Sequence, residues 1–205
     1  KIKVLGYDID TKKIEQLKKG NIPFEEKGLK QLFEEAKEYF YPVDELQSSD
    51  AFILTLPTPI TKEKTCDISF VLSAVKAVAK VLEDDNLVIL ESTVSPGTTL
   101  QTVKPNLDQT GKQYYLSYVS EKAIPGDTIR EMQENQRIIG GIDEDSAEKT
   151  KALYSRFVNS CIHLTDCTTA ETVKLLENTY RDVNIALANE LAMRLSELGV
   201  NAWEA

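Results

Sequence analysis

Three polar side chains near the end of the chain are spaced in a way that could support chemistry. Lys174, Asn178 and Arg181 lie in the stretch ETVKLLENTYRDVNIALANEL, residues 171–191, whose length and composition predict one long helix. At about 100° per residue, the three side chains fall within an arc of about 60° on one helix face. A cation and an amide that point from such a face into a cleft could hold a small anionic ligand.

The same spacing also fits the solvated side of an amphipathic helix. In that case the residues on the opposite side would face a core, and these are Leu176, Thr179, Val183 and Leu187. The polar stripe continues one turn later into apolar residues, which a purely solvated face would not do: Ile185, Ala188 and Ala192. Two interpretations therefore stay open, a solvated face and a helix buried on both sides.

The elements that must position this helix alternate between strand-like and helix-like segments. Apolar runs typical of buried strands occur at residues 2–8, 51–59, 86–93, 114–120, 137–141 and 161–165. Helical patterns occur between them, at residues 11–20, 28–40, 67–85, 98–109 and 144–157. This order predicts an α/β, Rossmann-like fold with a mainly parallel sheet and helices on both faces. Ligands of such sheets bind beyond the carboxyl ends of the strands.

Four candidate residues follow predicted strands, so we expect them at one edge of the sheet. Asp8 could accept hydrogen bonds from both hydroxyls of an adenosine ribose, whereas Asp10 is better placed to cap the following helix. Thr58 and Thr93 could donate to a ligand or water, or could simply form turns beside proline. Glu121 could orient a water or take a proton, although a lone glutamate can also be merely solvated.

The composition argues against several function classes. The net charge of −9, from 24 basic and 33 acidic residues, does not suit a nucleic-acid surface, which needs clustered lysine and arginine. No apolar run approaches a membrane span and no signal peptide is recognisable, so we expect a cytoplasmic protein without a membrane partner. Cys66, Cys161 and Cys167 lack metal-type spacing, which predicts reduced, structural thiols and no metal site. The single His163 is expected to pack inside, which argues against a histidine triad.

An ordered set of short motifs resembles the nucleotide-sugar dehydrogenases. The motifs are GYDID, TLPTP with CDIS, ILESTVSPGTT, SEKAIPG, RIIGG and KLLENTYRDVNIALANEL. The resemblance implies NAD-dependent oxidation of the C6 alcohol of a UDP- or GDP-sugar to the uronic acid, for precursors of cell-surface polysaccharides. The last motif and AIPG are most similar to the branch that acts on UDP-N-acetylhexosamines such as UDP-N-acetylmannosamine.

The resemblance also implies roles for the candidate residues. The cofactor-binding residues would be Asp8, Lys13, Thr58 and Thr93, with Asp8 and Lys13 at the adenosine end of NAD. Thr93 would also lie near the reacting water, which Glu121 would position. The substrate-binding residues would be Lys122, Ala123, Lys174, Asn178 and Arg181. Lys174 and Asn178 would be catalytic with Glu121 and Thr93, because an ammonium and an amide stabilise the negative charge that develops on the alcohol oxygen.

The resemblance further implies a division into two domains and a fragment of a longer protein. Residues 1–168 would form the NAD-binding domain, without its first strand and glycine loop, and residues 169–205 would begin an all-α domain through which relatives form homodimers. The family's nucleophilic cysteine lies well downstream in a GGHC-like segment, so we expect this chain to be inactive alone. Two alternatives remain open at this point: another β-hydroxyacid dehydrogenase and a non-catalytic nucleotide-binding module.

Overall fold

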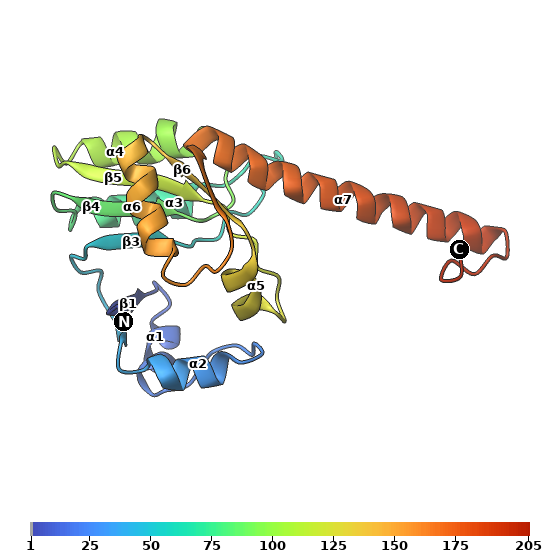
Figure 1. The fold of residues 1–205 in the computed structure, drawn as a ribbon, viewed down its shortest axis with the longest axis horizontal. Coiled ribbons are helices and arrows are strands. Elements are labelled where there is room, and N and C mark those ends of the chain that lie inside the picture. The colour runs from blue at the N-terminus through green and yellow to red at the C-terminus, as the bar shows by residue number, and fades with distance from the viewer. Residues whose placement is uncertain (1) are drawn as a thin grey trace.

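The computed structural model describes residues 2–205 and contains two sheets (Figure 1). A two-stranded parallel sheet pairs β1 (Val4–Tyr7) with β2 (Phe40–Val43). A five-stranded sheet has its strands in chain order: β3 (Ala51–Leu54), β4 (Asn86–Leu90), β5 (Tyr114–Val119), β6 (Arg137–Gly141) and β7 (Ile162–Asp166). Only the β5–β6 pair among the paired strands of residues 2–205 is antiparallel, which confirms the mainly parallel sheet.

Helices cover both faces of the larger sheet, as the sequence predicts. The helices are α1 (Thr11–Lys18), α2 (Leu29–Ala36), α3 (Ser69–Ala79), α4 (Lys104–Asp108), α5 (Thr128–Glu134), α6 (Glu144–Tyr154) and α7 (Cys167–Glu197), and a π-helical turn, η1 (Thr99–Val103), leads into α4. One apolar core joins α3, α4 and the start of α7 to the first three strands of this sheet. A second core packs Tyr154 of α6 against the opposite face, on Ile89 and Ile139. Both cores exclude water from apolar side chains, which is the main stabilisation of this fold.

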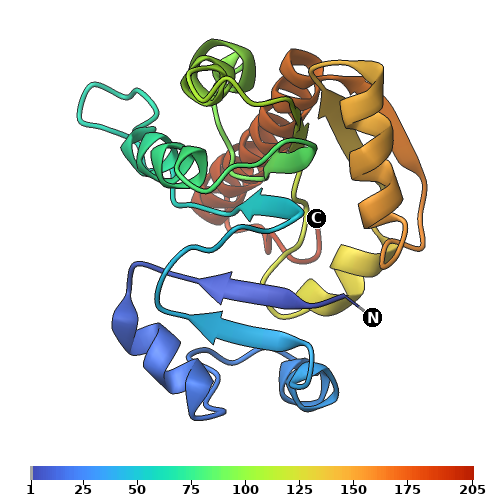
Figure 2. The same cartoon turned by 90° about the vertical axis from the view of Figure 1, so that its left-hand side faces the viewer.

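The carboxyl ends of β3, β4 and β5 meet at one edge of the larger sheet, whereas β6 and β7 run in the opposite direction. Strands β3, β4 and β5 are mutually parallel, so the loops after Leu54, Leu90 and Val119 lie at the same edge. Figure 2 shows β1 and β2 beside β3 and running in the same direction, although the two sheets share no hydrogen-bonded strand pair among residues 2–205. The segments that carry Asp8, Thr58, Thr93 and Glu121 therefore leave the strands at this end.

Two sequence expectations about local structure are wrong. The predicted helix over residues 28–40 ends at Ala36, and Phe40 begins β2. The aromatic residues of this strand favour a sheet, and the ring of Phe40 occupies the space that a Cβ on Gly6 would need. His163 is exposed rather than packed inside, because its neighbours Ile162 and Leu164 take the core-facing positions of β7.

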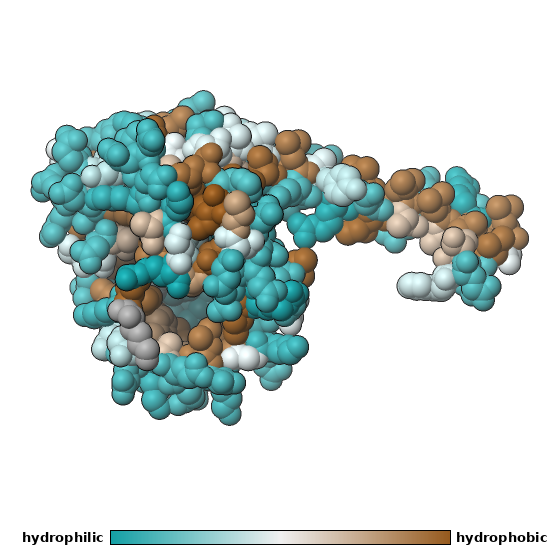
Figure 3. Space-filling view, in the orientation of Figure 1, coloured by the Kyte–Doolittle hydropathy of each residue, from teal (hydrophilic) through white to brown (hydrophobic). Residues whose placement is uncertain are grey.

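Helix α7 starts in the core and then projects away from the sheet (Figure 1). Asp166 caps its first turn by accepting a hydrogen bond from the backbone N–H of Thr169 at 2.9 Å. Cys167 and Ala170 are fully buried, whereas Val183 is 60% exposed and Leu187 is 57% exposed. The expectation of a helix buried on both sides therefore fails for the distal part of α7, where Figure 3 shows hydrophobic side chains on the surface.

Candidate functional site

The proximal turns of α7 meet the loop that follows β5. Lys174 donates a hydrogen bond from its ammonium to the backbone carbonyl of Glu121. One turn further along α7, Glu177 forms an ion pair with Lys122, with 2.6 Å between the carboxylate oxygen and the ammonium nitrogen. The helix and the loop are thus joined by two contacts, and both involve residues around the sequence-predicted stripe.

A groove of about 370 Å³ lies at this junction. It is lined from α7 by Lys174, Glu177 and Arg181, from the β5–α5 loop by Lys122, and from the α5–β6 loop by Asn135 and Gln136. Three cations and one carboxylate make the lining positive in a chain whose net charge is −9. The groove is therefore suited to an anionic ligand, because Coulomb attraction is strengthened where water is partly excluded.

Partial burial changes the pKa of Lys174. Removal from water lowers the pKa of its ammonium, and the nearby carboxylates of Glu121 and Glu177 partly oppose that shift. Arg181 is exposed and donates to the side-chain oxygen of Asn178 at 2.8 Å. The structure thus brings the predicted stripe together on one face, with its half-buried end at Lys174 and its exposed end at Arg181.

Glu121 and Ala123 form a tight local turn. The backbone N–H of Ala123 donates to the carboxylate of Glu121, so this carboxylate folds back on its own loop. Its backbone carbonyl meanwhile accepts from Lys174. Glu121 is half-buried and retains the second carboxylate oxygen for a water or a substrate, since an ionised carboxylate has about four acceptor positions.

The loops after β3 and β4 are joined by hydrogen bonds that involve both predicted threonines. Thr58 donates from its hydroxyl to the backbone carbonyl of Thr93 at 2.7 Å. The backbone N–H of Leu56 donates to the hydroxyl of Ser92, also at 2.7 Å. Thr58 is therefore already committed as a donor to the neighbouring loop, while the hydroxyl of Thr93 remains half-buried at the strand ends.

Asp8 and Lys13 lie together after β1. The carboxylate of Asp8 accepts from the backbone N–H of Asp10 at 2.8 Å and from the Lys13 ammonium at 3.1 Å. The first of these contacts is the main cause that lowers the pKa of Asp8, so the group is ionised at neutral pH. Two hydrogen bonds leave about two acceptor positions on the carboxylate, which fits a ligand that offers a pair of hydroxyl groups, such as a ribose.

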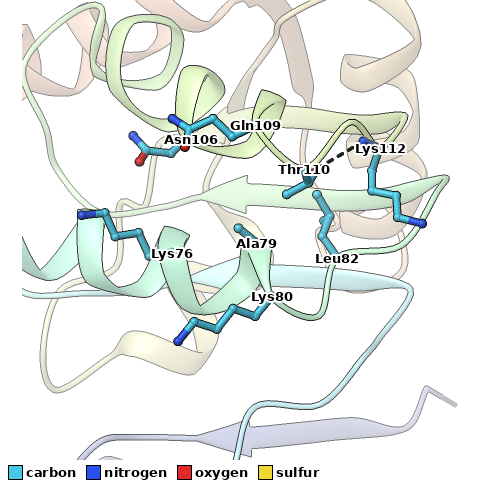
Figure 4. Close-up of a pocket in the computed structure, with 8 residues that line it drawn as sticks. All are labelled: Lys76, Ala79, Lys80, Leu82, Asn106, Gln109, Thr110 and Lys112. Carbon is cyan, nitrogen blue, oxygen red and sulfur yellow. Dashed lines mark hydrogen bonds between the residues drawn. The ribbon is translucent and has the colours of Figure 1, made fainter.

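A second groove lies between α3 and α4 (Figure 4). Lys76, Lys80 and Lys112 contribute positive charge to its lining. Figure 4 shows the three ammonium groups pointing in different directions, and Lys112 already pairs with Asp84 at 3.5 Å. These lysines do not converge on one ligand atom, so the groove beside Lys174 is the stronger candidate.

Four residues around the site were missed by the sequence reasoning. Glu177 and Glu171 lie one turn after and one turn before Lys174, so the three-residue spacing along α7 could have indicated them. Asn135 and Gln136 come from a loop that only the β6 pairing brings to the groove. No group of three or more His, Cys, Asp or Glu side chains in residues 2–205 could hold a metal ion. Nor does any helix in this part of the chain have the length and apolar character to cross a membrane.

Comparisons with known proteins agree with this geometry. Residues 1–158 match the NAD-binding domain of the UDP-glucose/GDP-mannose dehydrogenase family, and residues 168–205 match the central domain of the same family. The chain belongs to this family. The match confirms the resemblance stated above, with NAD as the cofactor of the first domain.

Individual members of this family are similar to nearly the whole chain. The UDP-N-acetyl-D-mannosamine dehydrogenase of Methanococcus maripaludis is 44% identical over 98% of this chain and 48% of its own length. The NDP-N-acetyl-D-galactosaminuronic acid dehydrogenase of Ralstonia nicotianae is 38% identical over 98% of this chain and 51% of its own length. The structure of the UDP-D-ManNAc dehydrogenase of Pyrococcus horikoshii superposes with a TM-score of 0.94, at 37% identity over 99% of this chain and 50% of that one. The chain thus spans about half the length of these relatives.

Proposed function

We propose that this chain belongs to an enzyme that oxidises the C6 alcohol of a UDP-N-acetylhexosamine, such as UDP-N-acetylmannosamine, to the uronic acid with NAD. The observation that carries the proposal is the groove in which Lys122, Lys174 and Arg181 gather beside Glu121. A UDP-sugar brings a negatively charged pyrophosphate and a sugar alcohol to one place, which suits a groove lined by three cations, one of them the half-buried Lys174. In this proposal residues 1–168 bind the cofactor and residues 169–205 begin the substrate-binding helical domain.

NAD would supply the acceptor for the hydride that leaves the C6 carbon. Asp8 and Lys13 would hold the adenosine end, because the carboxylate of Asp8 retains free acceptor positions beside its two existing hydrogen bonds. Thr58 would act by holding the Thr93 loop, since its hydroxyl donates to the backbone carbonyl of Thr93. The Thr93 hydroxyl would then face the cofactor and the reacting water at the strand ends.

Lys174 would stabilise the substrate oxygen as it becomes negatively charged. An ammonium that burial has already stripped of part of its water responds strongly to a new negative charge, because little solvent must reorganise. Asn178 would add an amide donor from the next turn of the same face. Lys122, Ala123 and Arg181 would bind the sugar nucleotide, and Glu121 would orient the water required for the second oxidation.

The thiols of this chain do not suit covalent catalysis. Burial raises the pKa of Cys167 to about 12, and its sulfur donates to the backbone carbonyl of Gly140 at 3.1 Å. Burial also raises the pKa of Cys66, and Cys161 is exposed and does not line the groove. A neutral thiol is a poor nucleophile, so residues 1–205 alone would not hold an aldehyde as a covalent intermediate.

The distal part of α7 would bind a second copy of the chain. Five exposed apolar residues fall within an arc of about 80° along α7, namely Leu176 in the proximal turns and Tyr180, Val183, Leu187 and Leu191 beyond them. Such a stripe on an otherwise unsupported helix is stabilised by packing against another helix. A homodimer would bury the stripe while leaving the opposite face of the proximal turns, with Lys174, open to substrate.

The test measures NADH formation with UDP-N-acetylmannosamine by two proteins, the 205-residue chain and a longer protein that contains it. We expect weak NAD binding and no turnover by the chain alone, and steady NADH formation by the longer protein. Turnover by residues 1–205 would contradict the assignment of their cysteines. Failure of the longer protein to oxidise any UDP-sugar would refute the proposed function.

A further inference from the structure

Glu171 is a carboxylate with no exposure to solvent, and α7 places it one turn before Lys174. It accepts three hydrogen bonds: from the backbone N–H of Gly97 at 2.6 Å, from the backbone N–H of Thr99 at 2.8 Å and from the Thr99 hydroxyl at 2.6 Å. Burial of a carboxylate is costly unless hydrogen bonds compensate it. All three donors come from one segment, so Glu171 attaches that segment to α7.

The attached segment is the continuation of the loop that carries Thr93. Gly97 lies four positions after Thr93, and its backbone has a φ of +91°, a conformation that favours glycine. The same loop is held on its other side by the hydrogen bond from Thr58 to the carbonyl of Thr93. A continuous set of contacts therefore runs from the β3 loop through the β4 loop to α7.

The hydrogen bonds of Glu171 and those of Lys174 act on different loops. Glu171 holds the segment after β4, whereas Lys174 contacts the carbonyl of Glu121 after β5. Both residues lie on the same helix, three positions apart. The distance between the Thr93 loop and the Lys174 ammonium is consequently set by the Glu171 carboxylate and one turn of helix.

We propose that Glu171 is a positioning residue that fixes the Thr93 loop relative to Lys174 for the oxidation proposed above. The inference rests on that proposed function, because Thr93 would face the cofactor and Lys174 the substrate. Glu171 itself would contact neither the cofactor nor the substrate, because its side chain has no exposure. Its three neutral donors hold the carboxylate in one orientation, and burial raises its pKa while the hydrogen bonds from Thr99 oppose that rise.

Two substitutions separate this role from simple packing. Glu171→Gln keeps the shape of the side chain but turns an NH₂ group toward the N–H of Gly97 or Thr99, so at least one contact becomes repulsive. Thr99→Val keeps the buried carboxylate and both backbone contacts and removes only the hydroxyl donor. Glu148→Gln on α6 is the matched control, since Glu148 is exposed and pairs with Lys151 on its own helix.

The first measurement is hydrogen–deuterium exchange of the 205-residue chain, which needs no activity. We expect residues 92–101 to exchange at least about tenfold faster in Glu171→Gln than in the unsubstituted chain, and a smaller acceleration in Thr99→Val. Glu148→Gln should leave the same segment unchanged. Equal exchange in all four chains would show that Glu171 does not hold the loop and would overturn the proposal.

The second measurement is initial-rate kinetics of the longer protein with NAD and UDP-N-acetylmannosamine. We expect Glu171→Gln to lower kcat about 10- to 100-fold with a KM for the sugar changed less than about threefold, because displaced reacting groups slow the reaction without weakening substrate contacts. Thr99→Val should show the same split, more weakly. Unchanged kcat in both variants, or a loss explained fully by the unfolded fraction, would overturn the positioning role. An inactive unsubstituted protein would instead refute the proposed function, and the positioning role with it, while the exchange result would still report on the contact.

Discussion

The two halves of α7 both carry apolar side chains but have opposite surroundings. In the proximal turns, Cys167, Ala170 and Glu171 have no exposure, and every charged group between Glu171 and Glu177 has a partner from another element. In the distal turns, Leu187 is 57% exposed and Met193 is 63% exposed. One continuous helix therefore combines a segment fixed by the sheet with a segment whose apolar stripe has no neighbour within residues 2–205.

This difference shows what an amphipathic pattern can and cannot specify. The stripe formed by Leu176, Val183 and Leu187 predicts burial, and the pattern is the same whether the covering surface belongs to this chain or to a second copy. The proximal turns are fixed because β5 and β6 lie beneath them. Chemistry is expected at the fixed end, since catalytic groups must be held within a fraction of an ångström.

The largest expected difference between the sheet-packed core and the distal part of α7 is in the free energy of unfolding. Leu107→Ala removes a fully buried side chain from the core beneath α4 and should lower the free energy of unfolding by about 2–5 kcal/mol. Leu187→Ala removes a similar side chain from the distal helix and should change it by less than about 0.5 kcal/mol in dilute protein. Guanidinium unfolding followed by circular dichroism measures both, because the single Trp203 is 98% exposed and would report poorly on unfolding.

Protein concentration tests the proposed dimer in the same experiment. If two copies pair through α7, the unfolding midpoint should rise with concentration, and Leu187→Ala should reduce that rise. Sedimentation of both proteins at matched concentrations gives an independent measurement. A midpoint that is independent of concentration, together with a monomer at all concentrations, would exclude the distal stripe as a dimer contact in this chain.

The next effect concerns the fixed end of the helix and is kinetic. In the longer protein, Lys174→Ala should lower kcat about a hundredfold, roughly 3 kcal/mol, because the ammonium meets a charge that develops only in the transition state. Asn178→Ala should act in the same way, more weakly. Arg181→Ala should instead raise KM, since an exposed guanidinium binds ground state and transition state alike. An unchanged kcat for Lys174→Ala would show that the polar stripe is a solvated helix face without a catalytic role.

Most of the fold could be predicted from the sequence because its strands and helices carry strong local patterns. The apolar runs at 86–93 and 114–120 became β4 and β5, and Asp10 caps α1 as its position suggested. Strand β2 was missed because its four residues, FYPV, follow directly on a helical pattern and contain a proline. Its place is determined by pairing with β1, which is a contact between residues about 36 positions apart.

The candidate site was predictable only where it follows helix periodicity or strand ends. Lys174 and Glu121 were found in this way, and the structure places their side chain and carbonyl in contact. Asn135 and Gln136 carry no local signal, because they reach the groove only through the antiparallel return of β6. In the sequence Glu171 resembles any solvent-facing glutamate of a helix. Its burial depends on Gly97 and Thr99, which are far away in the sequence.

The smallest effect lies at the N-terminus of α7 and depends on pH. Thr169 donates from its hydroxyl and its backbone N–H to Asp166, and the hydroxyl contact is the main cause that lowers the pKa of this carboxyl below 3.8. A carboxyl whose pKa is lower in the folded state stabilises the fold above its unfolded pKa, and this contribution is lost as the pH falls through the folded value. Asp166→Ala should therefore cost about 1 kcal/mol at pH 7 and less at about pH 3. Asp182→Ala, at an exposed position of the distal half, should change stability by less than about 0.5 kcal/mol at either pH. Guanidinium unfolding at the two pH values measures all three proteins, and a penalty for Asp166→Ala that stays constant or grows toward pH 3 would show that the charge of Asp166 does not stabilise the start of α7.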